Sequence, residues 1–158
     1  MRKIFCLLVT MIGALMHKGF SVVVDYSLSL QEMIDEGKFS STNEDIVEAN
    51  FPLREKGKQK ITIELKNFGK FMHPDDVLSD FDKKGLRPAS LPELCALGAK
   101  YPGLKKKKLI LALGSVWADP DSYCYYPCIH KDAEGRWLCL IAWHDGLDGH
   151  CWFATVRK

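Results

Sequence analysis

"DSYCYYPCIHKDAEGRWLCLIAWHDGLDGHCWF", from Asp121 to Phe153, is the stretch of the sequence that decides the fold. It alternates short apolar runs with turn residues, which is typical of β-strands joined by tight connections. We predict strands at 123–129, 136–143 and 151–156, with a hairpin loop at 132–135 and a Gly/Asp loop at 145–149. The C-terminal third of the chain is therefore expected to be a small antiparallel β meander.

The preceding part of the chain reads as alternating strands and helices. "FSVVVDY" (20–26) is a β-branched run and "QKITIELKNF" (59–68) alternates polar with apolar residues, so both favour strands. Two segments begin with a Ser followed three residues later by a Glu, which predicts a capping box: Ser29 with Glu32, and Ser90 with Glu93. The second of these helices has an apolar stripe, formed by Leu91, Leu94 and Leu97.

Two further helices are expected in the same part of the chain. "HPDDVLSDFDKKG" (73–85) places a proline and two aspartates in its first turn and lysines before a glycine at its end. This order suits the helix dipole at both ends. "STNEDIVEANFP" (41–52) permits a short helix that ends before Pro52. Gly37 is expected to end the helix that Ser29 begins.

These patterns together predict an α+β fold. Residues 20–103 form an N-terminal αβ portion, and residues 104–158 form a β-rich C-terminal portion. Residues 1–19 open with two basic residues followed by an apolar stretch, which fits a signal peptide as well as it fits a mis-called start or a first buried element. The apolar stretch is too short to cross a bilayer, so we expect no integral membrane span. Both a cytoplasmic and an exported location stay open, as does the oligomeric state.

Composition limits the classes of partner. The chain has 158 residues, is 47% hydrophobic and 27% charged, and carries a net charge of +2. Such a composition is typical of a globular protein without a strong overall field. The lysine run 105–108 lacks the interleaved aromatic residues that stack on bases, and we interpret it as a loop. We expect no nucleic-acid partner, and instead a macromolecular or small ligand that the sequence does not name.

The C-terminal strands and loops carry an unusual density of aromatic, Cys, His and Asp residues. Alternation along 136–143 separates Leu138 and Leu140 from Trp137, Cys139 and Trp143, so one set is expected in the core and the other at the surface. Exposed aromatic residues beside Asp and His are typical of a contact surface. The predicted ligand-binding residues are Tyr123, Tyr125, Trp137, Cys139, Trp143, His144, Asp145, Asp148, His150 and Trp152.

A metal site and a disulfide framework are the alternatives. Cys124 and Cys128 on one strand would lie about 13 Å apart, too far to share an ion, and His150 and Cys151 would face opposite ways. We therefore predict no metal site and no cofactor. Four cysteines in the last 35 residues could form two bridges in an oxidising compartment, and a reducing one would leave them as thiols. A zinc- or disulfide-stapled interaction module is thus the runner-up function.

Four segments are similar to a group of conserved hypothetical bacterial proteins: "NFP" (50–52), "LRPASLPEL" (86–94), "ALGSVW" (112–117) and "FATVRK" (153–158). The closing part also resembles the C-type-lectin-like fold of formylglycine-generating-enzyme-like domains and of diversity-generating retroelement target proteins. The second resemblance implies a non-enzymatic binding protein with a variable surface, because adenine-directed mutagenesis yields Tyr, His, Cys, Asp, Ser and Gly codons. The chain departs from those tails at 146–147, where Gly-Leu replaces Asp-Trp, and at Trp152.

We expect no enzymatic activity. Formylglycine-generating enzymes use a cysteine pair near the C-terminus, for which Cys124 and Cys128 are the nearest candidates, but this chain is much shorter than those enzymes. No other residue is placed to supply an oxyanion donor. The sequence also lacks a Ser-His-Asp order, a phosphate-binding glycine loop and an H-E-x-x-H motif.

Alternation along the C-terminal strands generates a direct prediction. Substitutions at Trp137, Cys139, Trp143 or His144 should change the free energy of unfolding by no more than about 0.5 kcal/mol if these residues are at the surface. Substitutions at Leu138, Leu140 or Phe153 should cost roughly 2–5 kcal/mol, because each deletes a buried apolar side chain. A deep substitution scan scored for folding measures both sets, and equal intolerance in the two would remove the surface assignment.

Overall fold

The computed structural model describes residues 19–104, 109–142 and 148–158, and contains three helices and nine strands. The helices are α2 (Leu30–Gly37), α3 (Pro74–Lys83) and α4 (Leu91–Lys100). The strands are β1 (Phe20–Asp25), β2 (Ser41–Thr42), β3 (Lys58–Lys66), β4 (Leu86–Pro88), β5 (Leu109–Leu111), β6 (Trp117–Ala118), β7 (Cys124–Lys131), β8 (Arg136–Ala142) and β9 (Cys151–Arg157). The expected mixture of helices and strands is therefore confirmed. The interpretations of the N-terminal segment and of the lysine run fall outside the described residues.

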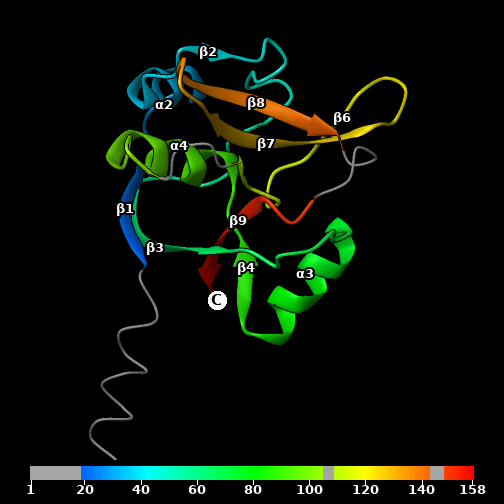
Figure 1. Ribbon diagram of the computed structural model, residues 1–158. Helices are drawn as coiled ribbons and strands as arrows, with labels where there is room; N and C mark the ends of the chain where they lie inside the picture. The colour runs from blue at the N-terminus through cyan, green and yellow to red at the C-terminus, as the bar shows by residue number, and fades with distance from the viewer. Residues whose placement is uncertain (1–18, 105–108, 143–147) are drawn as a thin grey trace, which may run out of the picture.

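All of these strands belong to one sheet, in the order β1-β3-β9-β5-β7-β8-β2 (Figure 1). β4 adds to β9, and β6 adds to β7. The neighbours are antiparallel except for two parallel pairs, β5 with β9 and β2 with β8. Strands from 20–103 therefore border a block of four strands from 104–158 on both sides, since β3 pairs with β9 at one end of the block and β2 pairs with β8 at the other.

The expected C-terminal meander is only partly right. β7 and β8 form the predicted hairpin, with Asp132 and Gly135 joined at its turn. β9 does not continue from β8, but lies between β3 and β5. The reason is its apolar character on both faces, because a strand of this kind gains most by occupying the centre of a sheet.

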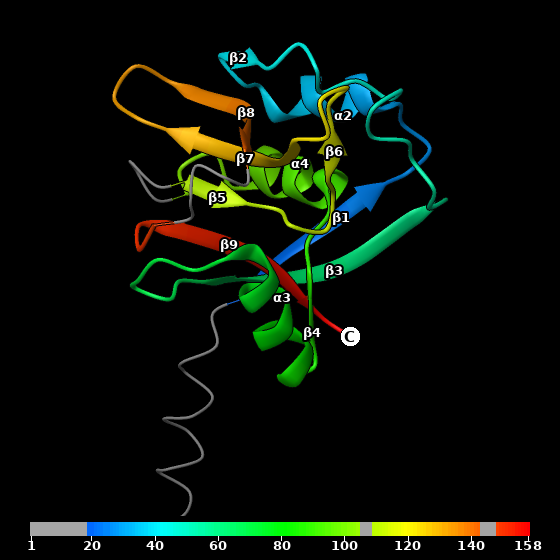
Figure 2. The same ribbon diagram turned by 90° about the vertical axis from the view of Figure 1, so that its right-hand side faces the viewer.

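Side chains on the two faces of the sheet form two separate cores. Figures 1 and 2 show α2 and α4 on one side of the sheet and α3 on the other. The first core contains Leu94 and Leu97 of α4 together with Ile63, Ala154 and Leu138 of the strands. The second core lies against α3. Its buried members are Val77, Phe81, Leu86, Leu111, Leu113, Tyr126, Cys128, Cys151 and Phe153.

The helix ends follow the sequence signals closely. Both predicted capping boxes form: the Ser29 amide donates to Glu32 (2.7 Å) and the Ser90 amide donates to Glu93 (2.9 Å). The one difference is at Gly37, which is the last helical residue of α2, while Lys38 adopts the left-handed conformation (φ 51°). A Cβ at Gly37 would lie 2.3 Å from the Phe39 ring, so this glycine is required for packing.

The short helix expected at 41–52 does not form. Ser41 and Thr42 pair with Trp137 and Leu138 as strand β2 instead. Asn43 then accepts a hydrogen bond from the Asp45 amide through its side chain (2.9 Å), which favours a turn over a helical start. The chain continues through turns to Phe51, whose side chain is buried in the first core.

Among the residues that the structure describes, no helix combines the length and the apolar character needed to cross a membrane.

The Ser90 cap leads to a stability prediction. The Ser90 hydroxyl donates a hydrogen bond to the Glu93 carboxylate (3.1 Å), so Ser90→Ala should lower the free energy of unfolding by about 1 kcal/mol. Ser79→Ala is the matched control, because Ser79 is exposed inside α3 and alanine favours a helix interior. Chemical denaturation measures both variants, and equal midpoints for Ser90→Ala and wild type would contradict the cap.

Candidate functional site

The residues expected to bind a ligand do not converge on one place. The Tyr125 ring packs against Trp117 in a tilted arrangement (ring centroids 5.5 Å apart), and its hydroxyl donates to Asp119 (3.2 Å) at one end of the β7–β8 hairpin. Trp137 stacks on His130 (5.8 Å) at the other end. His130 lies five residues after Tyr125 on β7. The Tyr125–Trp117 pair and the His130–Trp137 pair are therefore roughly 16 Å apart along the strand.

The other candidates vary in their surroundings. Tyr123 is 52% exposed. Cys139 is half-buried against the second core, so it is less accessible than simple alternation suggests. Trp152 is half-buried and packs against the first core. The candidates Trp143, His144 and Asp145 lie outside the described residues.

Asp148 and His150 belong to the turn that enters β9. The Asp148 carboxylate accepts a hydrogen bond from the His150 amide (2.8 Å). The Asn67 side-chain amide donates to the carbonyls of Gly149 and Cys151 (both 2.8 Å), which ties the turn to the end of β3. Asp148 therefore orders this turn, and both Asp148 and His150 remain exposed.

Metal ligation and disulfide bonding were the alternatives for the cysteines. In the described part of the chain, no three His, Cys, Asp or Glu side chains are grouped so as to hold a metal ion. The described cysteines are all thiols: Cys95, Cys124, Cys128, Cys139 and Cys151. Two of them face each other, with Cys128 Sγ 3.3 Å from Cys139 Sγ.

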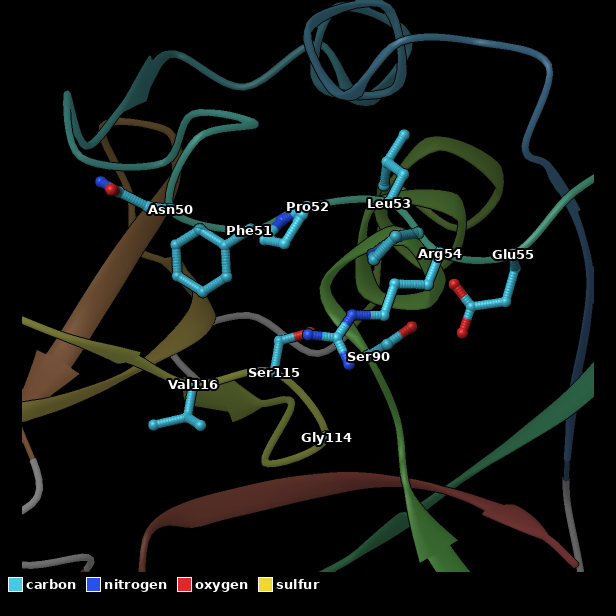
Figure 3. A pocket seen from close by; sticks show the side chains of 11 residues that line it. Asn50, Phe51, Pro52, Leu53, Arg54, Glu55, Ser90, Gly114, Ser115 and Val116 are labelled. Carbon is cyan, nitrogen blue, oxygen red and sulfur yellow. The ribbon is translucent and has the colours of Figure 1, made fainter.

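A pocket of about 410 Å³ is lined by none of the predicted ligand-binding residues (Figure 3). Its walls come from the segment 50–55, from the start of α4 and from the turn between β5 and β6. The lining residues are Asn50, Phe51, Pro52, Leu53, Arg54, Glu55, Ser90, Pro92, Gly114, Ser115 and Val116. Three of the four segments quoted for the resemblance contribute to it: 50–52, 86–94 and 112–117.

The floor of the pocket is fixed by backbone contacts. The Gly114 amide donates to the Ala89 carbonyl (2.8 Å), and a Cβ at Gly114 would lie only 2.6 Å from that oxygen. Only glycine therefore permits this approach. The next residue, Ser115, accepts a hydrogen bond from the Leu91 amide (2.8 Å), one of the amides that a helix start leaves without a helical partner. The β5–β6 turn is thus fastened to the beginning of α4.

Charged side chains lie at the rim of the pocket and next to its lining. Arg54 and Glu55 are exposed, and Figure 3 shows the Arg54 side chain extending across the pocket toward Ser90 and Ser115. Glu93, 2% exposed, bonds to Ser90 of the lining and receives two hydrogen bonds from Arg87 (both 2.8 Å). Because Arg87 is engaged with Glu93, Arg54 is the cation available to a ligand among the residues that line the pocket.

The pocket can bind a small molecule with an anionic group. Arg54 supplies a planar set of donors, which matches a carboxylate in bidentate geometry. The Ser115 oxygen accepts from Leu91, which leaves its own hydroxyl hydrogen able to donate toward a ligand. Apolar side chains from Pro52, Leu53 and Val116 provide contact surface for the rest of the molecule.

The sequence reasoning missed this pocket because it followed unusual residue types. Arg54, Ser90 and Ser115 are ordinary residues, and only the fold brings them together. The available signal was the presence of compact Pro, Gly and Ser segments at 50–52 and 112–117, which the resemblance had singled out.

A scan against protein-family models found no match, and searches among curated proteins and among solved structures found none either.

Tyr26 next to this region generates a pH prediction. Burial, reinforced by the charges of Glu93 and Glu55, raises the pKa of Tyr26 from 10.0 to about 12. Because the folded state holds this proton more tightly, the contribution of Tyr26 to stability is complete below pH 10.0 and is lost as the pH rises toward 12.

Tyr26→Phe should therefore reduce the fall in the free energy of unfolding across that alkaline range. Tyr123→Phe is the control, because Tyr123 is an exposed tyrosine, and it should keep the wild-type slope. Denaturation curves recorded from pH 9 to 12 compare the three proteins. Identical slopes for Tyr26→Phe and wild type would contradict the assignment.

Proposed function

We propose that the protein binds a small carboxylic acid in the pocket between the segment 50–55, the start of α4 and the β5–β6 turn. The observation that carries the proposal is the Arg54 side chain extending over a polar floor in a cavity of about 410 Å³. Ligand pockets in proteins commonly have volumes of about 300–1,000 Å³, so this cavity suits a metabolite-sized molecule.

The two ends of the pocket suggest how the ligand is oriented. Its carboxylate pairs with Arg54 and accepts a hydrogen bond from the Ser115 hydroxyl. Its apolar part contacts Pro52 and Val116. Glu55, adjacent to Arg54 at the rim, favours a ligand that also carries an amino group, because opposite charges on neighbouring residues complement a zwitterion.

The hydrogen bonds of Ser90 and Glu93 favour a binding role for the pocket over a catalytic one. A serine nucleophile needs a base within hydrogen-bond reach. The Ser90 hydroxyl does donate to Glu93 (3.1 Å), but the same carboxylate also accepts hydrogen bonds from Arg87 and from the Ser90 amide. Arg87 occupies both carboxylate oxygens, so Glu93 is engaged as an ion-pair and capping partner. This supports a non-enzymatic role for the pocket.

The test is a titration of the full chain with a panel of small carboxylic acids and amino acids, followed by NMR. Binding should shift the amide signals of Gly114, Ser115 and Val116. Arg54→Ala should weaken the affinity roughly tenfold or more, since hydrogen bonds to charged groups contribute about 1.5–3 kcal/mol. Lys56→Ala is the matched control, because Lys56 is an exposed cation two residues away that does not line the pocket.

Equal affinities for Arg54→Ala and Lys56→Ala would overturn the role of Arg54. The absence of any shift at 114–116 across the panel would overturn the carboxylic-acid proposal. Comparison of each amino acid with its deaminated analogue tests Glu55, whose substitution by Gln should lower the affinity only for the ligand that carries the amino group.

A variable display surface on the C-terminal strands and loops is the second proposal. The exposure of Tyr123, Asp148 and His150 supports it. The separation of Tyr125 from Trp137 along the hairpin favours an extended contact with a macromolecule over a compact small-ligand site. A template repeat and a reverse-transcriptase gene beside the coding sequence would support this proposal as a retroelement target, and an invariant C-terminal sequence in closely related strains would contradict it.

A further inference from the structure

Two thiols meet in the centre of the β7–β8 hairpin, and neither lines the pocket. Cys128 of β7 and Cys139 of β8 are directly opposite in the strand register, and their Sγ atoms are 3.3 Å apart. A disulfide has an S–S distance of about 2.05 Å, so closing the bond requires each sulfur to move by less than about 1 Å. Small rotations of the two side chains can supply this movement.

The two thiols differ in their access to solvent. Cys128 is 1% exposed and belongs to the second core, beside Tyr126 and Phe153. Cys139 is half-buried and only packs against the edge of that core. A reagent in solution can therefore reach Cys139 and not Cys128. This asymmetry is typical of dithiol sites in which one cysteine attacks and the other resolves.

The hydrogen bond between the thiols also separates the pKa values of the two cysteines. Donation from Cys128 lowers the pKa of Cys139, while the hydrogen bond to Cys139 and burial raise the pKa of Cys128 well above its usual range. Cys139 therefore holds the larger thiolate fraction of the two. Since the thiolate is the nucleophile in disulfide exchange, Cys139 is the more reactive member of the pair.

We propose that Cys128 and Cys139 form a dithiol–disulfide exchange site whose substrate is a low-molecular-weight disulfide of the glutathione class. The Cys139 thiolate attacks one sulfur of the substrate, the substrate S–S bond breaks, and one thiolate leaves and takes a proton from water. Cys128 then attacks the Cys139 sulfur, and its proton passes to the departing thiolate, which leaves as the second thiol. Two protein thiols are oxidised to one disulfide, and one substrate disulfide is reduced to two thiols.

The remaining described thiols lack these features. Burial raises the pKa of Cys95 to about 12 and the pKa of Cys151 to about 11. Cys151 is buried next to Asp148, whose carboxylate also disfavours the thiolate. Cys124 is half-buried at the start of β7, roughly 13 Å along the strand from Cys128. It is the matched control, since it shares the strand but is not opposite Cys139.

The test uses the reduced full-length protein and oxidised glutathione. After incubation, denaturation and alkylation, peptide mass analysis should find one internal disulfide that joins the peptides containing Cys128 and Cys139. Cys128→Ser should accumulate glutathione on Cys139, because the resolving thiol is absent. Cys139→Ser should leave Cys128 unmodified, and Cys124→Ser should form the same internal disulfide as wild type.

A measurement on the wild-type protein covers the case in which a variant fails to fold. During brief treatment of the folded protein with iodoacetamide, Cys139 should be labelled roughly tenfold or more faster than Cys128, because burial suppresses the thiolate at Cys128. Faster labelling of Cys128, a disulfide between other cysteines, or no internal disulfide in the folded wild type would each overturn the proposal.

Discussion

Strand β9 is the constraint on which the rest of the structure depends. One edge of β9 pairs with β3, and its other edge pairs first with β5 at 151–153 and then with β4 at 155–157. Its side chains enter both cores in turn, with Phe153 in the second and Ala154 in the first. Thr155 is fully buried, and its hydroxyl donates to the Arg87 carbonyl (2.8 Å). A strand buried on both faces and bonded on both edges keeps the two parts of the chain together.

The pocket is a consequence of this arrangement. β5 leaves the edge of β9 where β4 joins it, and the two chain segments meet at the contact between Gly114 and Ala89. α4 begins directly after β4, so its first turn is placed next to the β5–β6 turn. Ser115 fastens that turn to Leu91. The position of Ser115 under Arg54 is therefore set by the central strands and not by the surface segment 50–55 alone.

Local signals in the sequence predicted helix starts and strand faces. They did not predict which strands pair, because that depends on residues far apart in the chain. The capping boxes at Ser29 and Ser90 depend on residues three positions apart, so the sequence alone contains the whole interaction. The alternation of Ile61, Ile63 and Leu65 likewise identified β3 and the face it buries. The parallel pairing of β5 with β9 joins residues about forty positions apart, and no local pattern specifies it. The pocket shares this limit, because Arg54 and Ser115 acquire a common site only through that pairing.

The edge of the sheet at β1 has its own consequence. β1 contains a run of β-branched residues, and Val23 is 53% exposed, a combination that in other proteins invites the addition of a foreign strand. Here the Ser21 carbonyl accepts hydrogen bonds from the Lys100 ammonium (2.6 Å) and the Tyr101 hydroxyl (3.0 Å), both at the end of α4. An incoming strand would find this acceptor occupied and a positive charge beside it. The end of α4 thus makes this part of the β1 edge a poorer partner for a strand of another molecule.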